Sequence, residues 1–223
     1  LPPKLEPVSP SRTNLPHRVG SFIGRRAQLD QISEAIGHTR LVTIIGSPGV
    51  GKSWLAQRFG LEALAGFSGG AWFVELSAVT EPMGLTSALA SALGVTLRGH
   101  DPLTEIGEAL KARGPMLLIF DNLEHLIGDT AHIIEQWLDG APEVRLLATS
   151  RQRIGVARES VVKLGIMSET EAISLFVGRA QRMDPEFMES DSVVEQVRDI
   201  VQHLDHLPLP IELAAARLPR LSL

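Results

Sequence analysis

A glycine-rich segment lies between an apolar run and a helical pattern in the first quarter of the chain. The apolar run is Leu41 to Ile45, and it leads directly into Gly46-Ser47-Pro48-Gly49-Val50-Gly51-Lys52-Ser53. The segment fits G-x-x-x-x-G-K-[ST] in its strand-loop-helix setting. Glycines allow positive φ angles there, so successive amide N-H groups can turn toward a polyphosphate at a helix N-terminus. We therefore predict a phosphate-binding loop in which Lys52 reaches the β- and γ-phosphates and Ser53 binds Mg2+.

The composition limits the class of protein. At 223 residues the chain is long enough for one substantial core and a small second lobe. No apolar run approaches the roughly 18 residues needed to span a bilayer. A net charge of -5 with scattered arginines argues against direct binding of nucleic acid. Without cysteine or a visible secretory signal, the expected location is the cytoplasm, with no membrane association.

Strand and helix patterns alternate through most of the chain. Apolar runs predict strands at 41–45, 71–76, 116–120, 144–148 and 161–164, and helices at 25–36, 52–65, 83–93, 102–112 and 129–139. Such alternation predicts an α/β fold, a parallel sheet covered by helices. After Leu164 only helical patterns remain, at 168 onward, 191–204 and 211–218. We expect a Pro-rich linker at 1–20, a P-loop nucleotide-binding domain at 21–165 and a small all-helical lobe at 166–223.

An acid follows the apolar strand 116–120. Asp121 at this position, downstream of a P-loop, has the form of a Walker B residue that helps to hold Mg2+. The next residue is Asn122, and an amide cannot act as a general base. Glu124 either polarises a water molecule for hydrolysis or is a solvated acid at the start of a helix.

An arginine follows the strand 144–148 and the residues Thr149 and Ser150. Arg151 therefore lies at the carboxyl end of a strand, on the ligand side of an open α/β sheet, where it can meet a γ-phosphate. The alternative is a surface arginine that pairs with an acid.

Six ordered segments resemble the motifs of STAND-class P-loop NTPases, from about residue 21 to 219. They are Phe22-Ile23-Gly24-Arg25, GSPGVGKS, LLIFDNLEHL, LLATSR, SETEAISLFVGRA and LPLPIELAAARL. This class includes the NB-ARC modules of apoptotic and plant resistance proteins and the ATPase modules of large bacterial transcriptional regulators. DNLEHL and ATSR are most similar to the bacterial regulators.

The resemblance implies an adenine nucleotide, ATP or ADP with Mg2+, as the ligand. It implies that Ile23 and Arg25 border the adenine and ribose, that Arg151 senses the γ-phosphate, and that Pro208 closes over the base or ribose. It also implies flanking domains, including a winged-helix domain after this segment. Two residues depart from the family pattern: His206 stands where Gly is usual before L-P-L, and Pro210 where Ala is usual after it.

The predicted site consists of three overlapping groups of residues. The catalytic group is Lys52, Asp121, Glu124 and Arg151, and the metal group is Ser53 and Asp121. The nucleotide-binding group is Ile23, Arg25, Gly46, Pro48, Gly49, Val50, Gly51, Lys52, Ser53, Trp54, Arg151 and Pro208. The apolar surroundings of Trp54, like those of Trp72 and Trp137, favour packing over base stacking. His203 and His206 lack a third ligand, and we predict no zinc site.

The leading functional hypothesis is a regulatory switch that binds ATP or ADP, with slow or conditional hydrolysis, in a signalling or transcription-regulating protein. Nucleotide-dependent self-association is one way in which such a switch could act. The alternatives are a steadily turning-over ATPase that uses Glu124, a small-molecule kinase, and a nucleotide-bound scaffold that never cycles. The L-P-L lobe argues against the kinase.

Overall fold

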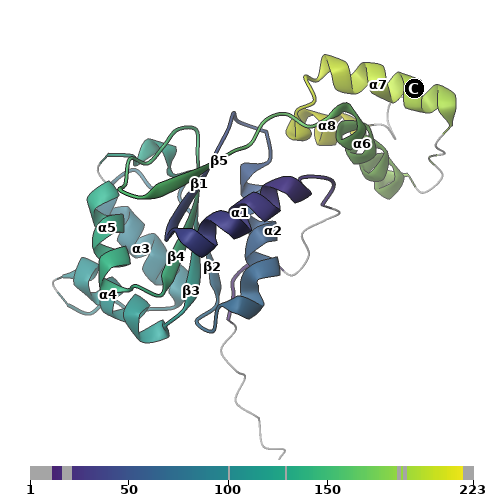
Figure 1. Cartoon of the computed structure of the whole chain (residues 1–223). Helices are drawn as coiled ribbons and strands as arrows, with labels where there is room; N and C mark the ends of the chain where they lie inside the picture. Colours follow the sequence, from purple (N-terminus) through teal and green to yellow (C-terminus); the bar gives the residue numbers. More distant parts are fainter. Residues whose placement is uncertain are drawn as a thin grey trace, which may run out of the picture.

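Five parallel strands form the centre of the part of the chain that the structure describes, residues 12–16, 22–99, 101–128, 130–184, 187 and 190–217. In this computed structural model the strand order is β2-β3-β4-β1-β5 (Figure 1). The strands are β1 Leu41–Ile45, β2 Ala71–Glu75, β3 Met116–Asp121, β4 Val144–Ser150 and β5 Glu159–Lys163. The predicted α/β fold is confirmed.

Helices cover both faces of the sheet. They are α1 Arg26–His38, α2 Lys52–Ala63, α3 Pro82–Leu93, α4 Pro102–Arg113 and α5 Ala131–Gly140, with short 3-10 turns η1 Leu64–Gly66 and η2 Leu123–His125. Strand β3 faces both layers because its side chains alternate. Leu117 and Ile119 pack with α1 and α2, whereas Leu118 and Phe120 pack with α3, α4 and α5. Within the described residues, no helix is both long enough and apolar enough to cross a bilayer.

Several element boundaries differ from the sequence prediction, and two of the differences have a clear physical reason. Helix α8, Pro208–Ala215, begins at Pro208 rather than at 211, because proline suits the first helical turn, where its missing N-H is not needed. Strand β5 begins at Glu159 rather than at 161. Its first residues, Glu159 and Ser160, are polar and pair with β1 at the edge of the sheet, so the search for apolar runs missed them.

The edge strand β2 is covered by residues 12–16, which belong to the predicted linker; residues 1–11 and 17–20 lie outside the described part. Asn14 Nδ2 donates to the carbonyl oxygen of Phe73 at 2.7 Å, and the amide N-H of Phe73 donates to Asn14 Oδ1 at 2.7 Å. Leu15 is buried against the α1 and α2 side of the sheet. One side-chain amide thus satisfies both backbone groups of an edge residue.

Replacing Asn14 with alanine should lower the free energy of unfolding by about 1 kcal/mol, because the N-H and C=O of Phe73 lose their protein partner and must bond to water instead. The measurement is denaturant unfolding. Arg12→Ala is the matched control. The N-H of Ala71 donates to the backbone oxygen of Arg12, and the substitution keeps that oxygen. Equal stability of the two variants would contradict a role for the Asn14 amide.

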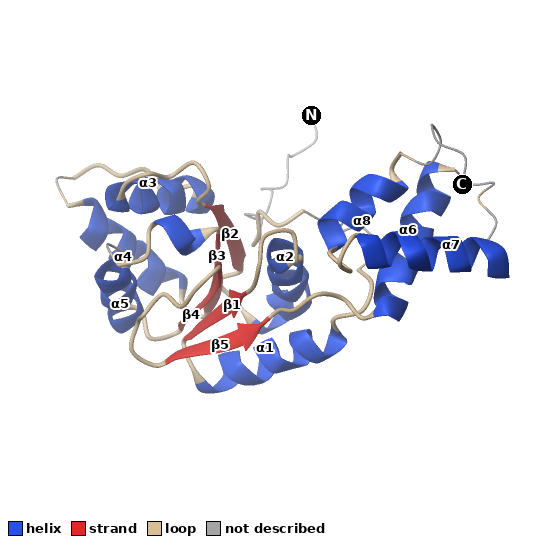
Figure 2. Cartoon of the chain, turned by 90° about the horizontal axis from the view of Figure 1, so that it is seen from above, coloured by secondary structure: helices blue, strands red, loops and turns tan. Residues whose placement is uncertain are grey.

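Three further helices form a lobe after β5: α6 Glu169–Met183, α7 Asp191–His203 and α8 (Figure 2). Phe176, Val197 and Ile211, one from each helix, are buried together in its core. Ser168 and Glu171 make a capping box that starts α6. The lobe therefore has an apolar cluster separate from those that flank the sheet.

Positive φ angles end helix α7. Asp205 has φ 51° and His206 has φ 52°. The N-H of Asp205 donates to Gln202 and the N-H of His206 donates to Val201, the pair of bonds of a Schellman motif. His206 therefore occupies the left-handed conformation that glycine adopts with less strain. Its carbonyl oxygen accepts from the N-H of Met167 at 3.1 Å, which joins this turn to the segment between β5 and α6.

Candidate functional site

The loop between β1 and α2 has the backbone that its glycines predict. Gly49 and Gly51 have φ angles of 76° and 96°, and helix α2 begins at Lys52. A Cβ atom at Gly46 would lie 2.5 Å from the carbonyl oxygen of Leu164. The loop therefore requires glycine at Gly46 for space and at Gly49 and Gly51 for conformation.

Lys52 is folded back onto the loop. Its Nζ donates to the carbonyl oxygens of Gly46 at 2.9 Å and Ser47 at 3.1 Å, and the residue is only 7% exposed. Burial lowers the pKa of this amine, whereas the negative charge of Glu124 opposes that shift. In the part of the chain that the structure describes, two carbonyl oxygens and no carboxylate hold this ammonium at hydrogen-bond distance.

Asp121 ends β3 beside the start of α2. Thr149 Oγ1 donates to Asp121 Oδ1 at 2.6 Å, and Ser53 lies near enough to favour the charged form of Asp121. Burial raises the pKa of Asp121, because a carboxylate is costly away from water. The hydroxyl and carboxylate oxygens of Ser53 and Asp121 are the hard ligands that Mg2+ prefers, so the two residues fit the predicted metal group.

Asn122 turns the chain after β3. It has φ 59°, and its N-H donates to Thr149 Oγ1 at 3.0 Å. The next turn, η2, presents Glu124, whose Oε1 accepts from Arg151 Nε at 3.0 Å. The Glu124 side chain is 18% exposed and lies in the first turn of η2, so Glu124 is a partly buried acid at a helix start. The alternative interpretation of Arg151 was an arginine that pairs with an acid. It does so, and the acid is Glu124, which belongs to the predicted site as well.

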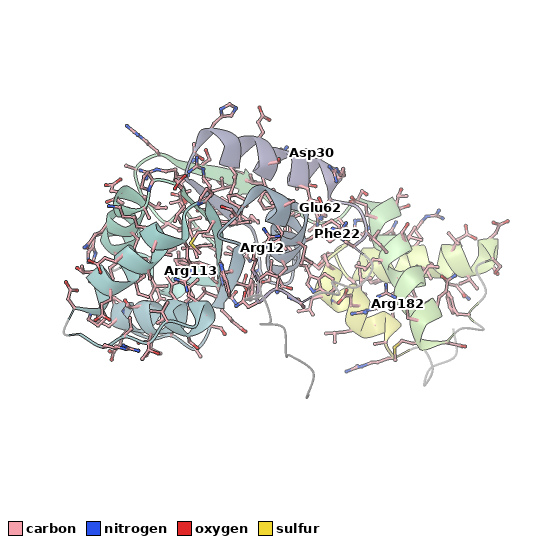
Figure 3. All side chains as sticks on the ribbon, turned by 90° about the horizontal axis from the view of Figure 1, so that it is seen from below. Arg12, Phe22, Asp30, Glu62, Arg113 and Arg182 are labelled. Atoms are coloured by element: carbon pink, nitrogen blue, oxygen red, sulfur yellow. The ribbon has the colours of Figure 1, made fainter. Side chains whose placement is uncertain are left out.

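These residues surround a cavity of about 330 Å³ between the sheet and the helical lobe. Of the nucleotide-binding residues predicted from the sequence, all but Gly46 line it; Asp121 does not. Its polar lining comes from the loop, Glu124 and Arg151. Its apolar lining includes Phe22, Ile23, Met167 and Leu175. Figure 3 shows Phe22 on the side of the sheet domain that faces the lobe.

Arg25 lines the cavity, but its guanidinium holds the segment between β5 and α6. Nη2 donates to Gly165 at 2.8 Å and Nη1 to Ile166 at 3.3 Å, both at carbonyl oxygens. The backbone N-H of Arg25 donates to Glu171 Oε1 at 3.0 Å. Burial lowers the pKa of Arg25, and Glu171 opposes that shift. Arg25 thus holds the segment between β5 and α6 by hydrogen bonds, a role that the sequence did not suggest.

The lobe touches the phosphate-binding loop directly. The N-H of Leu209, in the first turn of α8, donates to the carbonyl oxygen of Gly49 at 3.2 Å. Pro208 and Glu212 of the same helix line the cavity, and Glu212 is paired with Arg179 at 3.3 Å. Trp54, which belongs to the predicted nucleotide-binding group, lies at the cavity wall with 37% of its surface exposed, rather than packed in an apolar region.

Thr149 and Glu171 are two residues that sequence reasoning missed. Thr149 connects Asp121 to the backbone of Asn122, and Glu171 connects the capping box of α6 to Arg25. The position of Thr149, two residues before Arg151 at the end of a strand, was a signal for its place in the site. The second role of Glu171 depends on a contact 146 residues away in sequence, so no local pattern marks it.

Comparison with known proteins identifies the family to which the chain belongs. A family model described as an AAA domain matches residues 35–157. An uncharacterized protein of Mycobacterium tuberculosis is 37% identical over 205 residues, which cover 91% of this chain and 52% of the relative. Another M. tuberculosis protein, named provisionally as an HTH-type transcriptional regulator, is 35% identical over 189 residues, 84% of this chain and 21% of the relative. The chain thus spans about half the length of the first of these relatives.

Solved structures resemble the whole described fold at low identity. The Walker-type ATPase of Pyrococcus abyssi has a TM-score of 0.66 at 15% identity, over 91% of this chain and 69% of that one. Cdc6p from Pyrobaculum aerophilum has a TM-score of 0.68 at 19% identity, over 95% of this chain and 63% of that one. A STAND protein with a tetratricopeptide repeat sensor from Pyrococcus horikoshii has a TM-score of 0.54 at 19% identity, over 90% of this chain and 30% of that one. At such identities these likenesses concern the fold alone.

Proposed function

This chain is an AAA-domain P-loop NTPase, and from that premise we propose that it is an ATP- and ADP-binding switch module of a larger regulatory protein. The observation that carries the proposal is the cavity in which the phosphate-binding loop, the Glu124–Arg151 pair and the first turn of α8 meet. A ligand there touches the sheet domain and the lobe together. A change in the ligand can therefore change how the two parts fit.

The polar part of the cavity lining suits a nucleotide tail. The amide groups of the loop and the start of α2 favour anions, and Lys52 adds a charge. Ser53 and Asp121 would hold Mg2+, which when bound neutralises part of the phosphate charge. Thr149 holds the Asp121 carboxylate in place for that purpose.

The apolar part of the cavity lining suits the base. Ile23, Met167 and Leu175 give an apolar wall for a flat ring, and Pro208 lies on the lobe side. Adenine is the base that the STAND-like motifs imply. Because Pro208 and the loop-binding Leu209 begin the same helix, the position of the lobe depends on what fills the cavity.

Hydrolysis is proposed to be slow or conditional. Asn122 cannot accept a proton from water, and Glu124 is engaged by Arg151. Glu124 could serve as a general base only after Arg151 releases it. A steadily turning-over ATPase would need that release in every cycle, whereas a scaffold that never cycles would not need it at all.

The larger context is also proposed. One relative carries the name of an HTH-type regulator, which favours a role in transcription or signalling within a longer chain. We place the nucleotide-binding domain at 21–165, the helical lobe at 166–223 and a linker at 1–20, of which residues 12–16 pack on β2. In this proposal the module acts in the cytoplasm through flanking domains and nucleotide-dependent self-association, without contacting nucleic acid or membrane itself.

Calorimetric titration of the chain with ATP and with ADP, each with Mg2+, tests the switch. We expect both to bind, with dissociation constants that differ at least about fivefold, because only a difference in binding free energy can shift a conformational equilibrium. Equal affinities would favour the non-cycling scaffold. Absence of binding to either nucleotide would overturn the proposed function.

A further inference from the structure

We propose that the Glu124 carboxylate takes the place of the γ-phosphate when that phosphate is absent, and so sets the preference of this site between ATP and ADP. The inference rests on the proposed function and assigns a specificity-determining residue within it. Glu124 then acts as an internal anion that ATP must displace and that ADP leaves in place.

The position of Glu124 is the first argument. Its Oε1 accepts from Arg151 Nε at 3.0 Å, and both residues line the cavity beside Lys52. Arg151 is the residue proposed to contact the γ-phosphate. A guanidinium Nε-H that donates to a carboxylate is not available to a phosphate oxygen in the same arrangement, so the two anions compete for it.

The burial of the pair is the second argument. The Glu124 side chain is 18% exposed, whereas that of Arg151 is 63% exposed, so the acid is the inner partner. The second carboxylate oxygen, Glu124 Oε2, is buried and has no hydrogen-bond partner in the described structure. A buried charge with half of its acceptors unsatisfied depends on its cation, which makes the pair costly to break.

The charges around Lys52 are the third argument. Lys52, Glu124 and Arg151 all line the same cavity, and Glu124 bonds Arg151 directly. Glu124 therefore shares the cavity with both cations proposed to hold the last phosphate. A γ-phosphate placed between Lys52 and Arg151 would meet the carboxylate as a like charge, and ADP would not.

The local chain explains why Glu124 points there. Asn122 in its left-handed conformation turns the backbone after β3, and buried Leu123 anchors the 3-10 turn. The following residue is thus directed toward the end of β4, where Arg151 begins the next loop. Glu124, three residues after Asp121, thus reaches the arginine.

The test measures the ratio of ATP to ADP affinity, with Mg2+, in the wild-type chain and in Glu124→Gln. We expect the ratio to shift toward ATP by about tenfold, the effect of removing one competing charge at a charge-assisted hydrogen bond. Glu124→Asp, which keeps the charge on a shorter side chain, should shift the ratio less. Glu195→Gln, on the exposed face of α7, makes the same change in net charge and should not shift it.

Other outcomes separate this inference from its premise. A ratio that is unchanged, or that moves toward ADP, would overturn the role of Glu124 even if both nucleotides bind. Loss of phosphate release in Glu124→Gln with an unchanged ratio would identify Glu124 as the general base instead. Absence of binding to the wild-type chain would overturn both proposals. The thermal midpoint of each variant checks that it is folded.

Discussion

Lys52→Ala is expected to weaken the binding of ATP and ADP by roughly 100-fold or more. The Lys52 ammonium would form charge-assisted hydrogen bonds to the β- and γ-phosphates, and their loss costs about 3 kcal/mol. The folded loop should survive, because the bonds from Lys52 Nζ to Gly46 and Ser47 are only part of its support. Calorimetric titration of each nucleotide with Mg2+ measures the effect.

Lys111→Ala provides the comparison for this variant. Lys111 lies exposed in the last turn of α4, outside the cavity, and its removal makes the same change in net charge. Nucleotide affinity should stay within about twofold of the wild-type value, as for a surface charge screened by solvent. If both lysine variants weakened binding equally, the effect would come from net charge and not from the phosphate-binding loop.

Arg25→Ala is expected to lower the free energy of unfolding by about 2–4 kcal/mol. The change removes the donors to the carbonyl oxygens of Gly165 and Ile166, and hydrogen bonds of a charged group in a buried place are among the more costly to lose. The segment between β5 and α6 should also become accessible to proteases. Denaturant unfolding and limited proteolysis measure the two effects.

The neighbouring arginine offers a close control for that change. Arg26 is 73% exposed at its side chain and pairs with Asp30 and Glu62 on the surface. Figure 3 shows Asp30 and Glu62 on α1 and α2, on the outer side of the sheet. Arg26→Ala should cost less than about 1 kcal/mol, as exposed ion pairs do. A cost equal to that of Arg25→Ala would show that the bonds to Gly165 and Ile166 are not what Arg25 contributes to stability.

Much of the fold was predictable because its signals are local. The run Met116 to Phe120 is apolar throughout and strand β3 is buried on both faces, as expected for a central parallel strand. Gly46, Gly49 and Gly51 mark the loop through their conformations and the space around them. The polar start of β5 at Glu159 escaped detection because an edge strand need not be apolar along its whole length.

Prediction of the site was limited by contacts distant in sequence. Motif order placed Lys52 and Arg151 on the ligand side of the sheet, and both line the cavity. The pairing of Arg151 with Glu124, and of Arg25 with the segment after β5, depends on how turns direct individual side chains. Neither hydrophobic periodicity nor residue spacing carries that information, so the structure was needed to show that Glu124 is partly buried and paired with Arg151.

The contact of Asn14 with β2 limits how copies of this chain can assemble. A parallel sheet grows by adding a strand at an edge, and the backbone groups of Phe73 are the ones such a strand would need. Those groups already bond the Asn14 amide. A second molecule could extend the sheet on this side only by first displacing residues 12–16. Self-association that leaves this segment in place must therefore use other surfaces.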